Sequence, residues 1–198
     1  MVYAEMTPNP TTMKFVSNVL MLKPGVTVEY FSADECSEAP LPQALFQFPF
    51  VKSIFVSGNY VSITRNESVQ WGEVMGEIRD FVRKFLASGK DAILKVPEKA
   101  VPKDSGFKET VSVHTQHAAP QNETENKIIE VLEEYIRPAV EQDGGLITFQ
   151  SFQDGIVKVQ LRGACSGCPS STLTLKAGIE GLLKRMVPGV EEVVAENQ

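Results

Sequence analysis

The chain has 198 residues, of which 42% are hydrophobic and 22% charged, and it carries a net charge of −6. This composition is ordinary for a globular protein, and it lacks the basic footprint of a nucleic-acid binder. No apolar run approaches the ~18 residues that a membrane-spanning helix needs. We therefore expect one or two globular domains, with no nucleic-acid and no membrane partner.

The chain start and the cysteine count bear on location. Met1–Glu5 has neither the basic nor the apolar region of a secretory signal, and it does not resemble an Arg-rich transit peptide. The chain has three cysteines, and an odd number does not suit a disulfide framework. We therefore predict a reducing, cytoplasmic location.

The first 90 residues show the pattern of a small mixed domain. The helix stripe from Trp71 to Phe85 places apolar residues three and four apart, with Ser68 as its expected cap and Gly89 at its end. A shorter helix is expected at Pro40–Phe46. Apolar runs bounded by turn residues predict strands at Val2–Thr7, Met13–Val16, Val19–Leu22, Val26–Phe31, Val51–Ser57 and Tyr60–Arg65, the last two joined by Gly58-Asn59.

Residues 91–121 are predicted to be a flexible linker. They mix Lys, Pro, Ser, Thr, Gln and Ala with little periodicity. His114 and His117 lie here, and we interpret them as spacer residues because a mobile tether gives a metal ligand no fixed geometry. Cys36, in an acidic stretch without a second cysteine or histidine nearby, is predicted to have no role in the site.

Residues 122–198 predict a second domain in the order helix, strand, strand, helix, strand. Asn122 and Glu125 form a capping pattern, and Pro138 should kink or restart the first helix near Arg137. Asp154-Gly155 predicts a hairpin turn. A three-stranded sheet covered by two helices would bury the apolar stripes. The fold class is therefore α+β, with two small α/β-sandwich-like domains joined by the linker.

The stretch from Gly163 to Ser171 carries the clearest chemical signal. Cys165 and Cys168 are three positions apart, and Pro169 suits the first turn of a helix, which would place Cys168 at its N-cap. Unpaired N–H groups there favour the thiolate, the form that binds metals. Two thiols are only half of a four-ligand zinc or [4Fe-4S] site. Either the pair works as a dithiol, or two chains each contribute one pair.

The sequence resembles Nfu-type (NifU-like) iron–sulfur cluster scaffold or carrier proteins. The resemblance rests on the Gly163–Ser171 stretch, the Asp143-Gly144-Gly145 turn and Ile136–Val140, and in the first part on Thr7–Phe15. It implies an Nfu N-terminal domain at 1–90 and a NifU C-terminal cluster-binding domain at 122–198. It further implies that Cys165 and Cys168 of two protomers share one [4Fe-4S] cluster. The cluster would come from an upstream scaffold or be assembled here, and would pass to apo iron–sulfur recipient proteins.

Two other functions are compatible with the same cysteines. A dithiol–disulfide oxidoreductase would use Cys165 and Cys168 directly, although the order of elements is not thioredoxin-like and the proline follows the second cysteine. A structural zinc-bridged dimer would use the same four thiolates. The resemblance favours a binding and transfer protein that is not an enzyme and that forms a homodimer on cluster binding.

Overall fold

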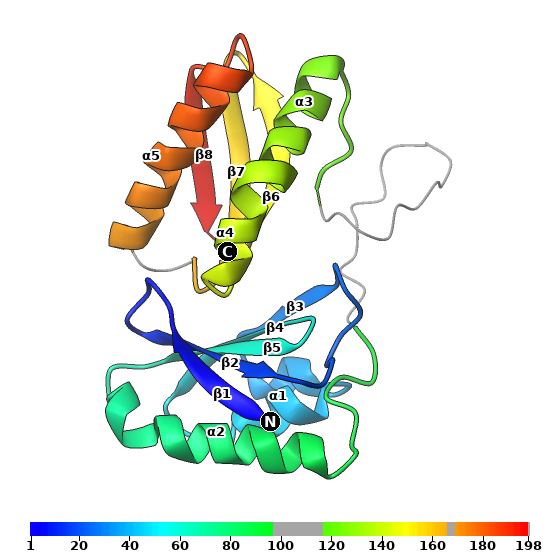
Figure 1. Ribbon diagram of the computed structural model, residues 1–198, viewed down its shortest axis with the longest axis vertical. Helices are drawn as coiled ribbons and strands as arrows, with labels where there is room; N and C mark the ends of the chain where they lie inside the picture. The colour runs from blue at the N-terminus through cyan, green and yellow to red at the C-terminus, as the bar shows by residue number, and fades with distance from the viewer. Residues whose placement is uncertain (97–116, 166–168, 198) are drawn as a thin grey trace.

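The computed structural model describes residues 1–96, 117–165 and 169–197, and of residues 169–172 and 197 only the backbone. These residues form two sheets, each with its own helices (Figure 1). The α+β prediction is confirmed. The linker boundaries at 91 and 121 stay a prediction.

The first sheet is antiparallel and has the strand order β1-β2-β5-β4-β3. Its strands are β1 (Val2–Met6), β2 (Thr12–Ser17), β3 (Thr27–Tyr30), β4 (Val51–Ser57) and β5 (Tyr60–Arg65). Three helical segments accompany it: η1 (Ala33–Cys36, a 3₁₀ turn), α1 (Pro40–Leu45) and α2 (Trp71–Ala87).

One face of this sheet packs against α1 and α2 and makes the core of the first domain. Alternate residues of each strand point to that face, as the period of two requires. Phe15 of β2, Ile63 of β5 and Ile54 of β4 are fully buried there with Ile78 and Val82 of α2. The helix stripe predicted from Trp71 onward is therefore the core-facing surface of α2.

Two local predictions in this domain are wrong at the level of individual contacts. Val19–Leu22 is not a strand, because the N–H groups of Met21 and Leu22 donate to the carbonyl of Gly58 at 2.8 and 3.0 Å. Gln70, not Ser68, precedes α2 and forms a capping box with Glu73. The Gly58-Asn59 hairpin and the positive φ of Gly89 (72°) agree with expectation.

The second domain has the predicted order of helix, strand, strand, helix, strand. Its strand order is β6-β7-β8, with β6 and β7 antiparallel and β7 and β8 parallel. The elements are α3 (Glu123–Val131), η2 (Leu132–Ile136), α4 (Arg137–Gln142), β6 (Gly145–Gln153), β7 (Ile156–Gly163), α5 (Pro169–Met186) and β8 (Glu192–Asn197).

Pro138 shapes the first helix of this domain as its chemistry requires. Proline has no N–H to donate to the preceding turn. The chain leaves the α-helix at Leu132, makes a π-helical turn through Ile136 and restarts as α4 at Arg137, so that Pro138 falls in the first turn of a new helix. The predicted restart near Arg137 is confirmed.

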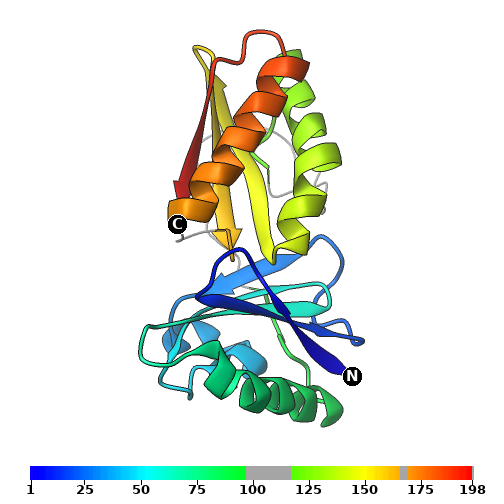
Figure 2. The same cartoon turned by 60° about the vertical axis from the view of Figure 1, so that its left-hand side comes forward.

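The β6–β7 hairpin turns at Asp154 and Gly155, whose φ angles of 50° and 78° are those of a type I′ turn. At the opposite end of the hairpin, β6 begins at Gly145 and β7 ends at Gly163, and these two residues are paired. Figures 1 and 2 show that this second end rests on the first sheet, on the face away from α1 and α2. The predicted cysteine site lies at this end.

Candidate metal centre

Cys165 lies just beyond the end of β7, in the connection to α5. The connection begins with Gly163, which has a φ of 66°, a conformation that residues with a Cβ rarely adopt. The N–H of Ala164 then donates to the carbonyl of Gly144 at 3.2 Å. The chain therefore folds back over the start of β6, and Cys165 is held beside the Asp143–Gly145 turn.

The Asp143–Gly145 turn is shaped to receive the cysteine. A Cβ added at Gly145 would lie 2.7 Å from the Sγ of Cys165 and 2.7 Å from the carbonyl oxygen of Arg162. The thiol therefore packs directly on the backbone of Gly145, in space that any other residue would fill. The pattern Asp-Gly-Gly, predicted only as a helix end, also makes one wall of the cysteine site.

Burial dominates the electrostatics of Cys165, whose exposed fraction is 6%. Burial, with a smaller contribution from the charge of Asp143, raises the pKa of the Cys165 thiol to about 12. The thiol is therefore protonated at neutral pH in this arrangement. Binding iron requires the thiolate, so a metal bound here would displace the proton of the Cys165 thiol.

The predicted partner, Cys168, lies outside the described residues, together with residues 166 and 167. The pairing of the two thiols is therefore still a prediction. The helix that follows begins at Pro169, as the sequence indicated. Within the described ranges 1–96, 117–165 and 169–197, no three His, Cys, Asp or Glu side chains gather closely enough to hold a metal ion.

The first domain contacts this cysteine connection, which the sequence did not indicate. The side chain of Asn9 donates to the carbonyl of Ala164 at 3.2 Å, and Glu29 accepts from the N–H of Gly163 at 3.2 Å. The hydroxyl of Tyr60 lies 3.5 Å from the carbonyl of Gly145, beside the cysteine. The site is therefore bordered by both domains.

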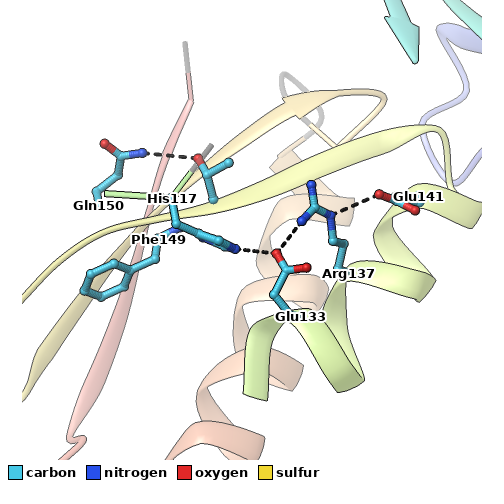
Figure 3. A network of polar contacts seen from close by, with 7 residues as sticks. His117, Glu133, Arg137, Glu141, Phe149 and Gln150 are labelled. Atoms are coloured by element: carbon cyan, nitrogen blue, oxygen red, sulfur yellow. Dashed lines mark hydrogen bonds and ion pairs between the residues drawn. The ribbon is translucent and has the colours of Figure 1, made fainter. Parts of the chain in front are cut away.

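His117 was interpreted as a spacer residue, and the structure places it differently. Its ring is buried against the second domain, where Nδ1 accepts from the N–H of Phe149 at 2.7 Å and Nε2 contacts Glu133. Arg137 joins Glu133 to Glu141 in the same network (Figure 3). His117 thus ties the chain before α3 to β6. His114 lies outside the described residues.

Cys36 is a core residue of the first domain. Its side chain is fully buried, and its Sγ lies 3.3 Å from the carbonyl of Ser32, to which it donates. Burial, with a smaller contribution from Glu35, raises the pKa of this thiol to about 11.

In the described part of the chain, none of the helices is both long enough and apolar enough to cross a bilayer.

Two family models match the chain. A model described as "Scaffold protein Nfu/NifU N terminal" matches residues 2–89, and one described as "NifU-like domain" matches residues 128–194. The second range contains Cys165 and Cys168.

Named relatives match along most of the chain. "NFU1 iron-sulfur cluster scaffold homolog, mitochondrial" of Drosophila virilis is 36% identical over 187 residues, which are 94% of this chain and 58% of the relative. The protein of the same name in Drosophila willistoni is 34% identical, with 94% of this chain and 60% of the relative covered. The chain thus spans about three fifths of the length of these relatives.

One solved structure, the solution structure of a NifU-like protein from Saccharomyces cerevisiae, is 27% identical to the chain. The match covers 48% of this chain and 85% of that one, with a TM-score of 0.40.

The comparisons correct one prediction. The reducing, cytoplasmic location was inferred from the chain start and the cysteine count. The Drosophila relatives are named as mitochondrial proteins, and the cytoplasmic prediction is therefore wrong. Neither composition nor cysteine number distinguishes one reducing compartment from another.

Proposed function

The chain belongs to the Nfu-type, NifU-like family of iron–sulfur proteins, and we propose that it is a mitochondrial scaffold that carries a [4Fe-4S] cluster and passes it to apo-proteins. The cluster is cargo, received or assembled and then released. Apo iron–sulfur proteins are its recipients, and an upstream scaffold is a source. The role is binding and transfer, without catalytic turnover.

One observation carries this proposal: Cys165 sits in a glycine-lined connection at the tip of the domain that matches the NifU-like model. Gly145 leaves the space into which Sγ packs, and Gly163 supplies the turn that places it there. Cys168 lies three positions further along the same connection.

The ligand count leads to a dimer. A [4Fe-4S] cluster takes four thiolates, and one chain offers only the two thiols of the predicted pair, Cys165 and Cys168. We propose that two copies meet tip to tip and share the cluster across a two-fold axis. Because each copy holds half of the ligands, exchange with a recipient can begin at either side.

The test is anaerobic reconstitution of the full chain with ferrous iron and sulfide, followed by iron and sulfide assays and mass in solution. We expect a brown dimer with about four iron and four sulfide ions per two chains. The variants Cys165→Ser and Cys168→Ser should each lose stable cluster binding and dimerisation. Cys36→Ser is the matched control, since it removes a buried thiol elsewhere.

Two outcomes would replace the proposal with the other functions of this cysteine pair. A colourless dimer that holds zinc and no sulfide would make the site structural. A monomer without metal, but with a readily reduced Cys165–Cys168 disulfide, would make it a dithiol oxidoreductase. A single serine variant that retains a full cluster would refute the shared-thiolate arrangement.

A further inference from the structure

The face of the first sheet away from α1 and α2 is buried, although its residues are largely polar. One row of paired residues crosses all five strands on this face, and a second row runs beside it. The first row consists of Glu5, Lys14, Ser62, Phe55 and Glu29, and the second of Tyr3, Val16, Tyr60, Ser57 and Thr27. Most of the central members are less than 9% exposed. The open face of an antiparallel sheet is normally solvated, so this face has a cover.

The cover is the tip of the second domain that carries Cys165. Ser62 donates its hydroxyl to the carbonyl of Gly144 at 2.9 Å, within the turn that walls the cysteine site. As described above, Asn9 and Glu29 bind the backbone of Ala164 and Gly163. Side chains of the first domain, from the sheet and from the loop between β1 and β2, therefore bind both segments that frame Cys165.

Lys14 adds a charged contact at the edge of the same tip. Its Nζ donates to the carbonyls of Glu141 and Gln142 at 3.2 and 3.0 Å, at the end of α4. A cation is favourable there because the last carbonyls of a helix are unpaired and carry the negative end of its dipole. Nζ also lies 4.6 Å from the centre of the Tyr60 ring.

Apolar and close steric contacts between the sheet and the tip accompany the polar ones. Val16, Phe55 and Tyr60 of the sheet form a small apolar cluster with Leu146 of β6. A Cβ at Gly144 would lie 2.7 Å from the Ser62 hydroxyl, and one at Gly163 would lie 3.0 Å from the Phe55 ring. The two glycines that shape the cysteine connection thus also let the sheet approach it closely.

The interface between the two domains nevertheless has the features of one that can dissociate. Among the described residues its apolar cluster is small, and its neutral hydrogen bonds, from Asn9 and Ser62, each contribute about 1 kcal/mol net. Polar interfaces between domains of one chain resemble transient ones. The two domains also belong to one chain, so each meets the other at a high effective concentration. The interface therefore forms without a high intrinsic affinity.

We propose that the first sheet is a built-in cover for the cysteine tip, closed in this structure, and that it must release the tip before two copies share a cluster. This inference rests on the proposed function. In the closed form the sheet binds the segments on either side of Cys165, and a second copy cannot bring its own tip against one that already contacts the sheet. The chain thus controls when its cysteines are offered.

The test measures opening without any iron. In a Cys168→Ser background, the chain keeps two cysteines, and alkylation of each is followed by mass spectrometry of its peptide. Lys14→Glu places a carboxylate against the carbonyls of Glu141 and Gln142. We expect Cys165 to be alkylated about ten-fold faster in this variant, as for loss of a charged hydrogen bond.

Two controls are built into the same experiment. Lys52→Glu makes the identical change at an exposed lysine of β4 and should leave the alkylation rate of Cys165 unchanged. Cys36, fully buried in the core of the first domain, should stay protected in Lys14→Glu, which excludes unfolding of that domain as the cause. If Cys36 becomes reactive, Ser62→Arg, which crowds Gly144, takes the place of Lys14→Glu.

Equal alkylation rates of Cys165 in the parent and in the interface variant, with Cys36 protected, would overturn the proposal that the sheet covers the tip. Reconstitution of Lys14→Glu with Cys168 intact supplies the second readout: we expect faster cluster loading than in the parent chain. If no chain takes up a cluster, the proposed function fails while the alkylation result still decides whether the sheet covers the tip.

Discussion

Cys36 and Cys165 are both buried in the apolar core of their own domain, but they differ in their place in that domain. Cys36 ends the turn η1 in the core of the first domain, where apolar residues surround it and one carbonyl accepts from its Sγ. Cys165 lies at the tip of the second domain, against glycine backbone and close to the first domain. Each thiol has a raised pKa for the same main reason, which is burial.

The difference lies in what would have to move to expose each thiol. Exposing Cys36 means opening a hydrophobic core, at the cost of much of the stability of the domain. Cys165 also packs in the apolar core of its domain, but it lies at the tip, which hydrogen bonds and a small apolar cluster hold against the first domain. Burial alone therefore does not distinguish a structural cysteine from a functional one. The free energy needed to expose the thiol is the quantity that distinguishes them.

The largest difference between the two cysteines is expected in metal binding. Cys165→Ser should abolish the reconstituted cluster and its dimer, because a serine hydroxyl does not replace a thiolate as an iron ligand. Cys36→Ser should leave iron content unchanged. Iron and sulfide per chain, measured on both variants in parallel, check this. Loss of cluster in Cys36→Ser would show that the two cysteines are not independent.

Gly145 provides the next largest effect. Gly145→Ala should destabilise the second domain by about 1–3 kcal/mol, since the new methyl group meets the Arg162 carbonyl and the Cys165 thiol at 2.7 Å. It should also lower the cluster yield. Gly178→Ala in α5 is the matched control, because nothing lies within 4 Å of its Cβ, and it should stabilise by about 0.5–1 kcal/mol.

Denaturant unfolding measures both glycine variants. Equal stability of Gly145→Ala and the parent chain would mean that the Cys165 connection is free to shift, and that the glycine is not needed for close packing.

Cys36→Ser should have a modest effect on stability. A hydroxyl placed in this apolar site retains the carbonyl of Ser32 as acceptor, so the cost should be about 1–2 kcal/mol of unfolding free energy. Chemical denaturation of the full chain, followed by a probe of the first domain, checks the value. A loss large enough to unfold that domain would contradict the assignment of the Ser32 carbonyl as a replacement partner.

The smallest effect is expected from pH at His117. Burial lowers the pKa of this ring despite the contact with Glu133, and Nδ1 must stay unprotonated to accept from Phe149. Glu133, Arg137 and Glu141 are the charged groups of its network. The unfolded chain takes up a proton near pH 6.5, where the folded chain does not. Stability should therefore be complete above pH 6.5 and fall as the pH drops towards the lowered pKa.

Urea unfolding at a series of pH values checks the titration of His117, with His117→Gln as the comparison. The variant should be less stable at neutral pH and should lose less stability below pH 6.5 than the parent chain. Parallel curves for the two proteins would assign the acid sensitivity to other groups, Glu133 first among them.

Elements whose residues decide their own conformation could be predicted from the sequence. The hairpins at Gly58-Asn59 and Asp154-Gly155 follow from residues that tolerate positive φ, and the restart at Arg137 follows from the missing N–H of Pro138. The apolar stripe of α2 likewise carries its own period. Each of these signals lies within one or two turns of chain.

Features that depend on distant partners could not be predicted. The alternation of residues in β2 indicates one buried and one solvated face of the sheet. Nothing in the sequence around Lys14 or Ser62 shows that the second domain covers the polar face. The sequence around His117 has the composition of a linker, and its contacts with Phe149 of β6 and with Glu133 give it a fixed place. For the candidate site, Cys165 was found from its spacing, whereas its burial and its contact with the first domain required the fold.

These hydrogen bonds between the domains run from side chains of the first domain to main-chain atoms of the tip: the carbonyls of Gly144 and Ala164 and the N–H of Gly163. Main-chain atoms do not change when a residue is substituted. Substitutions that adjust the strength of these hydrogen bonds therefore fall in the first domain, where changes at Asn9, Lys14 or Ser62 act directly. An engineer who wants a faster or slower release can work on one domain and leave the cysteine loop untouched.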